Sequence, residues 1–142
     1  MVSLLDQLKS DLTEMFSNRQ DSYKETIVKE EYETLPKGQY PRVVISEISN
    51  NSVLDRETSE GERTTLLGYQ FMVFSRDTAE YDASNSVRFM IKIIDDYIQN
   101  KYRMSRVAVT GVQAYIVDST VMTNTSRYTC VYDKETELIY TN

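Results

Sequence analysis

The stretch NSVRFMIKIIDDYIQNKYRMSR, residues 85–106, carries the strongest hydrophobic pattern in the chain. Five apolar residues recur at steps of three and four and form one stripe: Val87, Met90, Ile91, Ile94 and Ile98. Polar residues occupy the opposite face: Arg88, Lys92, Asp95 and Gln99. The pattern predicts an amphipathic helix packed on a core, with Ser84 or Asn85 as its cap. Ile93 and Tyr97 widen the apolar face beyond what one sheet requires.

A second helix is predicted for residues 3–17. Its apolar residues also recur at helical spacing: Leu4, Leu5, Leu8, Leu12, Met15 and Phe16. Ser3 followed by Asp6 is typical of a capping pair at a helix start. Asp6 and Asp11 interrupt the apolar pattern and no basic segment precedes it, unlike in a secretory signal peptide. We therefore expect a protein that is made and folded in a cytosol.

Several segments outside these helices favour β-strands. Residues 40–49, YPRVVISEIS, cluster β-branched residues directly after a proline. Residues 66–75 are apolar on both alternating faces, which predicts a central strand covered on both sides by this chain or by a neighbour. Alternation predicts two more strands at 106–118 and 126–133, and residues 138–141 form a short final strand or a tail.

Two polar segments separate these elements. Residues 20–40 are charged and predict an arm or an edge strand, whereas residues 49–65 predict a mobile loop. A chain of 142 residues is long enough for one hydrophobic core. The order of elements predicts a single α+β domain over residues 1–142. We expect two layers, with two main helices packed on a mostly antiparallel or mixed β-sheet.

The composition argues against most kinds of chemistry. The chain has no histidine and one cysteine, Cys130, for which we expect a buried and inert thiol. The four glycines are far apart and form no phosphate-binding loop. Asp95 and Asp96 would point about 100° apart on a helix, so they do not converge on one ion. The sequence therefore predicts no catalytic residue, no cofactor-binding residue and no metal ligand, and we expect a protein that is not an enzyme.

Charge and hydropathy limit the partners further. The net charge of −6 argues against a nucleic-acid-binding surface, which needs lysine and arginine to displace counterions from phosphates. No apolar run approaches the roughly 20 residues that cross a bilayer. We therefore expect neither specific nucleic-acid binding nor a membrane partner.

Eleven tyrosines without a tryptophan favour protein contact, because a tyrosine buries a large ring and still offers a hydroxyl group. Half-buried positions in an ordinary sheet are the alternative for each ring. The loop near residues 50–65 presents both signs of charge, although a solvated loop is an equal alternative. The predicted contact residues are Asp55, Arg56, Glu57, Glu60, Glu62, Arg63, Tyr69, Tyr128, Tyr132 and Tyr140.

The succession of segments carries a resemblance to a known family. A leucine-rich N-terminal helix is followed by YPRVVISEIS, a polar loop containing GER, LGYQFMVFSRD, the helix SVRFMIKIIDDYIQNKY, the strand RMSRVAV and the ending DKETELIYTN. This order resembles the tail terminator, or tail completion, proteins of long-tailed bacteriophages, and it covers nearly the whole chain.

The resemblance implies a two-layer subunit that forms a homohexameric ring without catalysis. Such a ring caps the tail tube and joins the tail to the head. The implied partners are further copies of the chain, the tail tube protein and a head-completion or neck protein. The implied location is the tail or neck of the virion, and the host cytoplasm during assembly. Two alternatives stay open: another neck component, such as a stopper or connector adaptor, and a small carboxylate-dependent metal nuclease.

Overall fold

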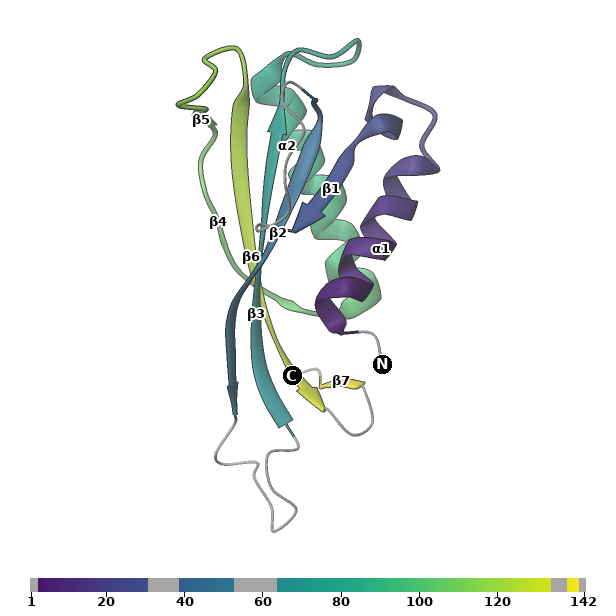
Figure 1. Cartoon of the computed structure of the whole chain (residues 1–142), viewed down its shortest axis with the longest axis vertical. Coiled ribbons are helices and arrows are strands. Elements are labelled where there is room, and N and C mark those ends of the chain that lie inside the picture. The colour runs from purple at the N-terminus through teal and green to yellow at the C-terminus, as the bar shows by residue number, and fades with distance from the viewer. Residues whose placement is uncertain (1–2, 31–38, 53–63, 134–137, 141–142) are drawn as a thin grey trace.

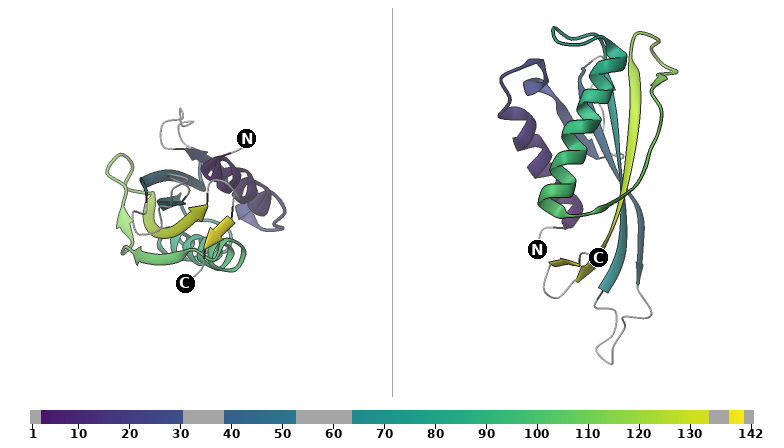
Figure 2. Two further views of the ribbon diagram at one scale, coloured as in Figure 1. Left: turned by 90° about the horizontal axis from the view of Figure 1, so that it is seen from below. Right: turned by 180° about the vertical axis from the view of Figure 1, so that it is seen from behind.

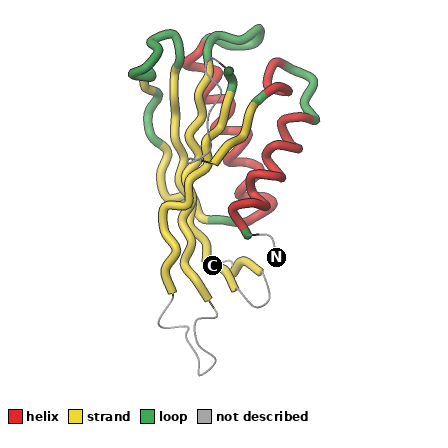
Figure 3. Tube along the Cα trace, viewed as in Figure 1, coloured by secondary structure: helices red, strands yellow, loops and turns green. Residues whose placement is uncertain are grey.

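The computed structural model describes residues 3–30, 39–52, 64–133 and 138–140 (Figure 1). A twisted β-sheet forms one layer and two helices form the other (Figure 3). The elements in chain order are α1 (Leu4–Ser17), η1 (Ser22–Glu25), β1 (Ile27–Glu30), β2 (Arg42–Ser52), β3 (Thr64–Ser75), α2 (Ala83–Tyr97), the π-helical turn η3 (Ile98–Tyr102), β4 (Ser105–Val109), β5 (Gln113–Ala114), β6 (Met122–Asp133) and β7 (Leu138–Tyr140).

The sheet is mixed, and its strand order is β1-β2-β3-β6-β4. β1 runs parallel to β2, whereas the β2–β3 and β3–β6 pairs are antiparallel. The free side of β6 is shared by three short strands, because β5, β4 and β7 pair with successive parts of it. The chain thus has the predicted α+β fold, with helices packed on a sheet.

Both helices cover the same face of the sheet. α1 packs on β1 and β2, and α2 packs on β3 and β6 (Figure 2, right). The α2 stripe predicted from the sequence lies entirely in the core. α1 buries four of its predicted apolar residues, Leu4, Leu8, Leu12 and Phe16, while Leu5 and Met15 are partly buried. The periodicity of the sequence therefore identifies the core side of both helices.

The predicted N-terminal cap is confirmed for α1 but not for α2. The Ser3 hydroxyl accepts a hydrogen bond from the Asp6 amide at 3.1 Å, so Ser3 is the cap that the sequence predicts. The cap of α2 is Asp82, whose carboxylate accepts from the Asn85 amide at 2.8 Å. The prediction of Ser84 or Asn85 was wrong because the helix begins one turn before the apolar stripe does.

The polar segments contain more regular structure than predicted. Within residues 49–65, the ends of β2 and β3 pair with each other, as in Asn51 with Leu66 and Ser52 with Thr65. The predicted loop is therefore wrong at residues 49–52 and 64–65, because ladder hydrogen bonds to a neighbouring strand outweigh weak local propensity. Its remainder, residues 53–63, lies outside the described residues.

The predicted arm and the predicted late strand are both shorter in the structure. Of residues 20–40, the part 27–30 is the edge strand β1, which confirms that alternative, and residues 31–38 lie outside the described part. The predicted strand 106–118 is interrupted between β4 and β5. The register of the pairing between β4 and β6 shifts between Arg106 and Ala108.

Candidate contact surfaces

Two of the predicted contact tyrosines belong to the chain's own core. Tyr69 is 1% exposed and Tyr128 is 0% exposed, and both rings lie in the cluster beneath the helices. The structure therefore corrects the prediction that these rings contact a partner. The reason is their position on central strands, where every second residue faces the helix layer.

The other predicted contact residues stay predictions. Tyr132 and Tyr140 lie in β6 and β7, where each pairs through its backbone with the neighbouring strand. The six charged residues predicted as contacts, Asp55 through Arg63, lie outside the described residues.

Asp95 connects α2 to two strands of the sheet. One carboxylate oxygen accepts from the Tyr128 hydroxyl at 2.7 Å, and the other accepts from Gln99 at 2.8 Å and Arg106 at 3.2 Å. The Asp95 side chain is only 16% exposed. The sequence pattern places Asp95 on a solvated helix face, but its partners on β4 and β6 make it a structural link.

A second polar link joins α1 to η3, the turn that follows α2. The Tyr102 hydroxyl donates to the Asp11 carboxylate, and the Lys101 ammonium group lies 3.1 Å from the same carboxylate. Burial raises the pKa of Tyr102, and the hydrogen bond to Asp11 raises it further. Burial also raises the pKa of Tyr128. Both phenols are therefore neutral at physiological pH.

A chain of buried hydroxyl groups joins η1, α2 and β3. Tyr23 and Ser86 are 2.9 Å apart, Ser86 and Ser75 are 2.7 Å apart, and Ser75 donates to the backbone carbonyl of Arg76 at 2.8 Å. Since each hydroxyl has one proton, Ser86 donates to Ser75 and Tyr23 donates to Ser86. The chain of donors ends on a carbonyl, so it holds elements together and activates no nucleophile.

A smaller cluster covers part of the sheet face opposite the helices. Its apolar members are Val44, Met72, Phe74, Val121, Tyr40 and Tyr115. The Arg42 guanidinium lies over the rings of Tyr40 and Phe74, at 4.6 and 5.3 Å. Arg76 lies 4.9 Å from the Tyr40 ring and pairs with Asp118 at 2.7 Å. The segment before β6 is therefore anchored to this face by stacking and by an ion pair.

The segment 105–117, here called the β4–β5 edge, contains four of the seven large apolar residues that are exposed among the described residues. Val107 is 61% exposed, Val109 42%, Ile116 100% and Val117 79%. All five residues of β4 are exposed, and among the described residues β4 pairs only with β6. An open strand edge with several exposed apolar residues is typical of a protein-contact surface. Sequence reasoning missed this surface, although the alternating valines of RVAV were its visible signal.

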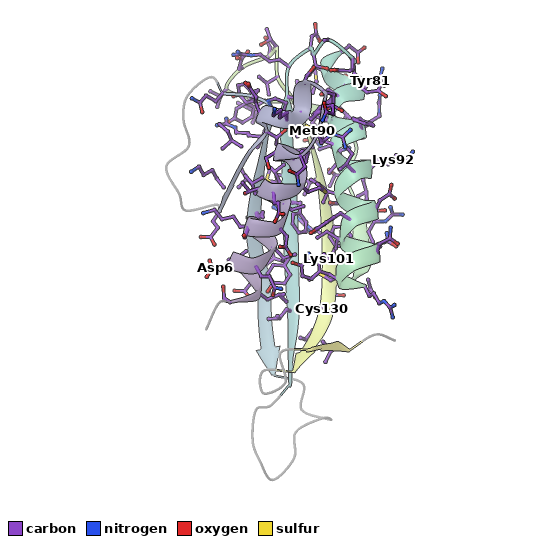
Figure 4. The ribbon with its side chains drawn as sticks, turned by 90° about the vertical axis from the view of Figure 1, so that its right-hand side faces the viewer. Asp6, Tyr81, Met90, Lys92, Lys101 and Cys130 are labelled. Atoms are coloured by element: carbon purple, nitrogen blue, oxygen red, sulfur yellow. The ribbon has the colours of Figure 1, made fainter. Side chains whose placement is uncertain are left out.

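A shallow hollow lies between α1 and α2 on the outer side of the helix layer, and we call it the helix groove. Its lining residues are Asp11, Glu14, Met15, Asn18, Arg19, Ile93, Asp96, Tyr97, Asn100 and Lys101. Figure 4 shows Lys101 between the two helices. A hydrogen bond to Tyr97, and next the one to Asp11, raise the pKa of Lys101, which therefore remains charged. The apolar floor and charged rim can receive an apolar segment flanked by charge.

The described residues were compared with what a metal site, a reactive thiol and a membrane-spanning helix require. Among them, no three His, Cys, Asp or Glu side chains gather where they could hold a metal ion. Burial raises the pKa of the Cys130 thiol to about 12, and the side chain is buried as predicted. Within the same part of the chain, no helix is long and apolar enough to cross a membrane.

The sequence was compared with protein-family models and with curated proteins. Neither a scan of protein-family models nor a search of the curated proteins finds a match to this chain. The functional assignment therefore depends on the order of the segments and on the surfaces described above.

Proposed function

We propose that this protein is a structural tail terminator, whose copies form a ring that caps a phage tail tube and joins the tail to the head. The observation that carries the proposal is the exposed β4–β5 edge. Four large apolar residues gather there within one short segment, while isolated exposed apolar residues are normal on a monomer. A subunit whose work is contact with other folded chains needs such a surface.

The sheet also extends beyond the helix layer, where β3 pairs with β2 on one side and with β6 on the other (Figure 1). Ile48 and Leu66 on this extension, here called the projecting arm, are 47% and 39% exposed. Single exposed apolar residues of this kind are normal on a monomer, so the proposal does not depend on the arm.

Charge is also consistent with a ring around a passage for DNA. The net charge is −6, and a wall of acidic subunits would repel the phosphate backbone rather than bind it. Since the chain lacks histidine, the side chain that most often serves as a general base is missing. Both features favour an assembly role.

Binding to purified phage parts tests the proposal. The protein is incubated with tail tubes, and separately with DNA-filled heads that lack tails, and each mixture is sedimented. We expect the protein to sediment with the tubes and to stop their elongation. Binding to heads alone would identify another neck component, and binding to neither would refute an assembly role.

A parallel incubation with plasmid DNA and Mg²⁺ or Mn²⁺ tests the enzymatic alternative. The proposal predicts intact plasmid. Cleavage that is lost when a single acidic residue is replaced would establish a nuclease and overturn the proposal.

A further inference from the structure

Basic side chains flank the β4–β5 edge. Arg106 on β4 binds Asp95 on α2, so the α2 face that carries Asp95 adjoins this edge. Lys92 and Arg88 precede Asp95 by three and seven residues and lie on the same helix face. Figure 4 shows Lys92 on the side of α2 away from α1. Since Arg106 is paired with Asp95, the positive charge beside the exposed valines comes from Arg88 and Lys92 on α2.

The helix groove has the complementary character. Met15, Ile93 and Tyr97 are partly buried and form its apolar floor. Its two basic residues already have acidic partners, because Lys101 pairs with Asp11 at 3.1 Å and Arg19 pairs with Asp21 at 2.7 Å.

The acids that remain give the groove its charge. Glu14 and Asp96 are exposed on the rim, and neither has an ion pair within the described residues. The rim is therefore acidic where a basic partner would approach.

We propose that the β4–β5 edge of one copy packs into the helix groove of a second copy. The left panel of Figure 2 places β4 and α1 on opposite sides of the molecule. Two different surfaces then meet head to tail, which is the arrangement that generates a closed ring or a filament. The inference rests on the proposed function in so far as it names the surfaces through which ring subunits meet.

Cross-linking of mixed isotopes tests the contact directly. Unlabelled and ¹⁵N-labelled protein are mixed in concentrated solution and treated with a zero-length carbodiimide, which joins lysines to carboxylates in contact. We expect peptides that join Lys92 of one isotope to Glu14 of the other. Their absence, or contacts that join the β4–β5 edges of two copies, would overturn the proposal.

Substitutions test the same contact by sedimentation velocity. Val107→Lys places a charge in the apolar edge at an exposed position, and we expect it to weaken self-association about tenfold. Ile48→Lys is the matched control, since it adds the same charge at a similarly exposed position on the projecting arm. Equal effects of the two substitutions would contradict the proposed contact.

Exchange of the two charges tests the same contact independently. Lys92→Glu and Glu14→Lys should each weaken association, and the chain that carries both should regain it, because the pair of charges is restored in reverse. Loss without recovery would remove these two residues from the interface. A protein that caps tubes but lacks the cross-link would refute the inference alone, whereas a protein that self-associates in this way but never binds tubes would refute the proposed function alone.

Discussion

Replacement of Asp95 by alanine should destabilise the fold far more than the same replacement of its neighbour Asp96. Asp95 accepts hydrogen bonds from Tyr128, Gln99 and Arg106, and it is largely buried. Asp96 is exposed on the helix groove. The two residues are adjacent in α2, so alanine brings both the same gain in helix propensity.

The magnitude follows from the contacts that Asp95→Ala removes. The Tyr128 hydroxyl is buried and would lose a charged acceptor at 2.7 Å, which costs about 1.5–3 kcal/mol. The ion pair with Arg106 adds only about 0.5 kcal/mol, because the arginine side chain is 48% exposed and solvent screens it. We expect Asp95→Ala to lower the free energy of unfolding by about 2–3 kcal/mol and Asp96→Ala to change it by less than about 0.5 kcal/mol.

Urea unfolding followed by circular dichroism measures both values. A cycle with Tyr128→Phe isolates the hydroxyl–carboxylate contact, for which we expect a coupling energy of about 1–2 kcal/mol. Equal stabilities of the Asp95→Ala and Asp96→Ala variants, or a coupling energy near zero, would refute the role of Asp95 as the link between α2 and the sheet.

Three further predictions concern ionisation. Because the pKa values of Tyr102 and Tyr128 are raised in the folded chain above the ordinary value of 10.0, stability should be fully present below pH 10 and fall as the pH rises above it. Alkaline unfolding should show this fall, and phenylalanine at both positions should flatten it. Cys130 should not react with a thiol reagent at neutral pH until urea unfolds the chain; rapid reaction in the native state would contradict its burial. Hydrogen bonds from Arg76, and next from Thr120, lower the pKa of Asp118 to about 2, so an NMR titration should find the value there and Arg76→Ala should raise it.

The helices could be predicted from the sequence because their signal is local. A stripe at steps of three and four identifies the buried side of α2 without knowledge of its partners. The Ser3 cap depends on a residue only three positions away. The α+β class followed from the order of such segments, since each amphipathic helix must cover an apolar sheet.

The features that escaped prediction depend on contacts between distant parts of the chain. Alternation in β6 does not reveal which face the helices cover, so the sequence could not show that Tyr128 is a core residue. The role of Asp95 depends on Tyr128, 33 residues away, and on the register of β4. The exposure of Val107 follows from its position on the last strand of the sheet, which is a property of topology.

Electron microscopy of tail tubes provides the most direct test of the claim that this protein works by contact through its β4–β5 edge. Tubes are incubated with the unaltered protein, with Val107→Lys or with Ile48→Lys, and the tube ends are inspected. We expect a ring on tube ends with the unaltered protein and with Ile48→Lys, and bare ends with Val107→Lys. Bare ends with the unaltered protein, or equal capping by all three proteins, would show that the β4–β5 edge does not make this contact.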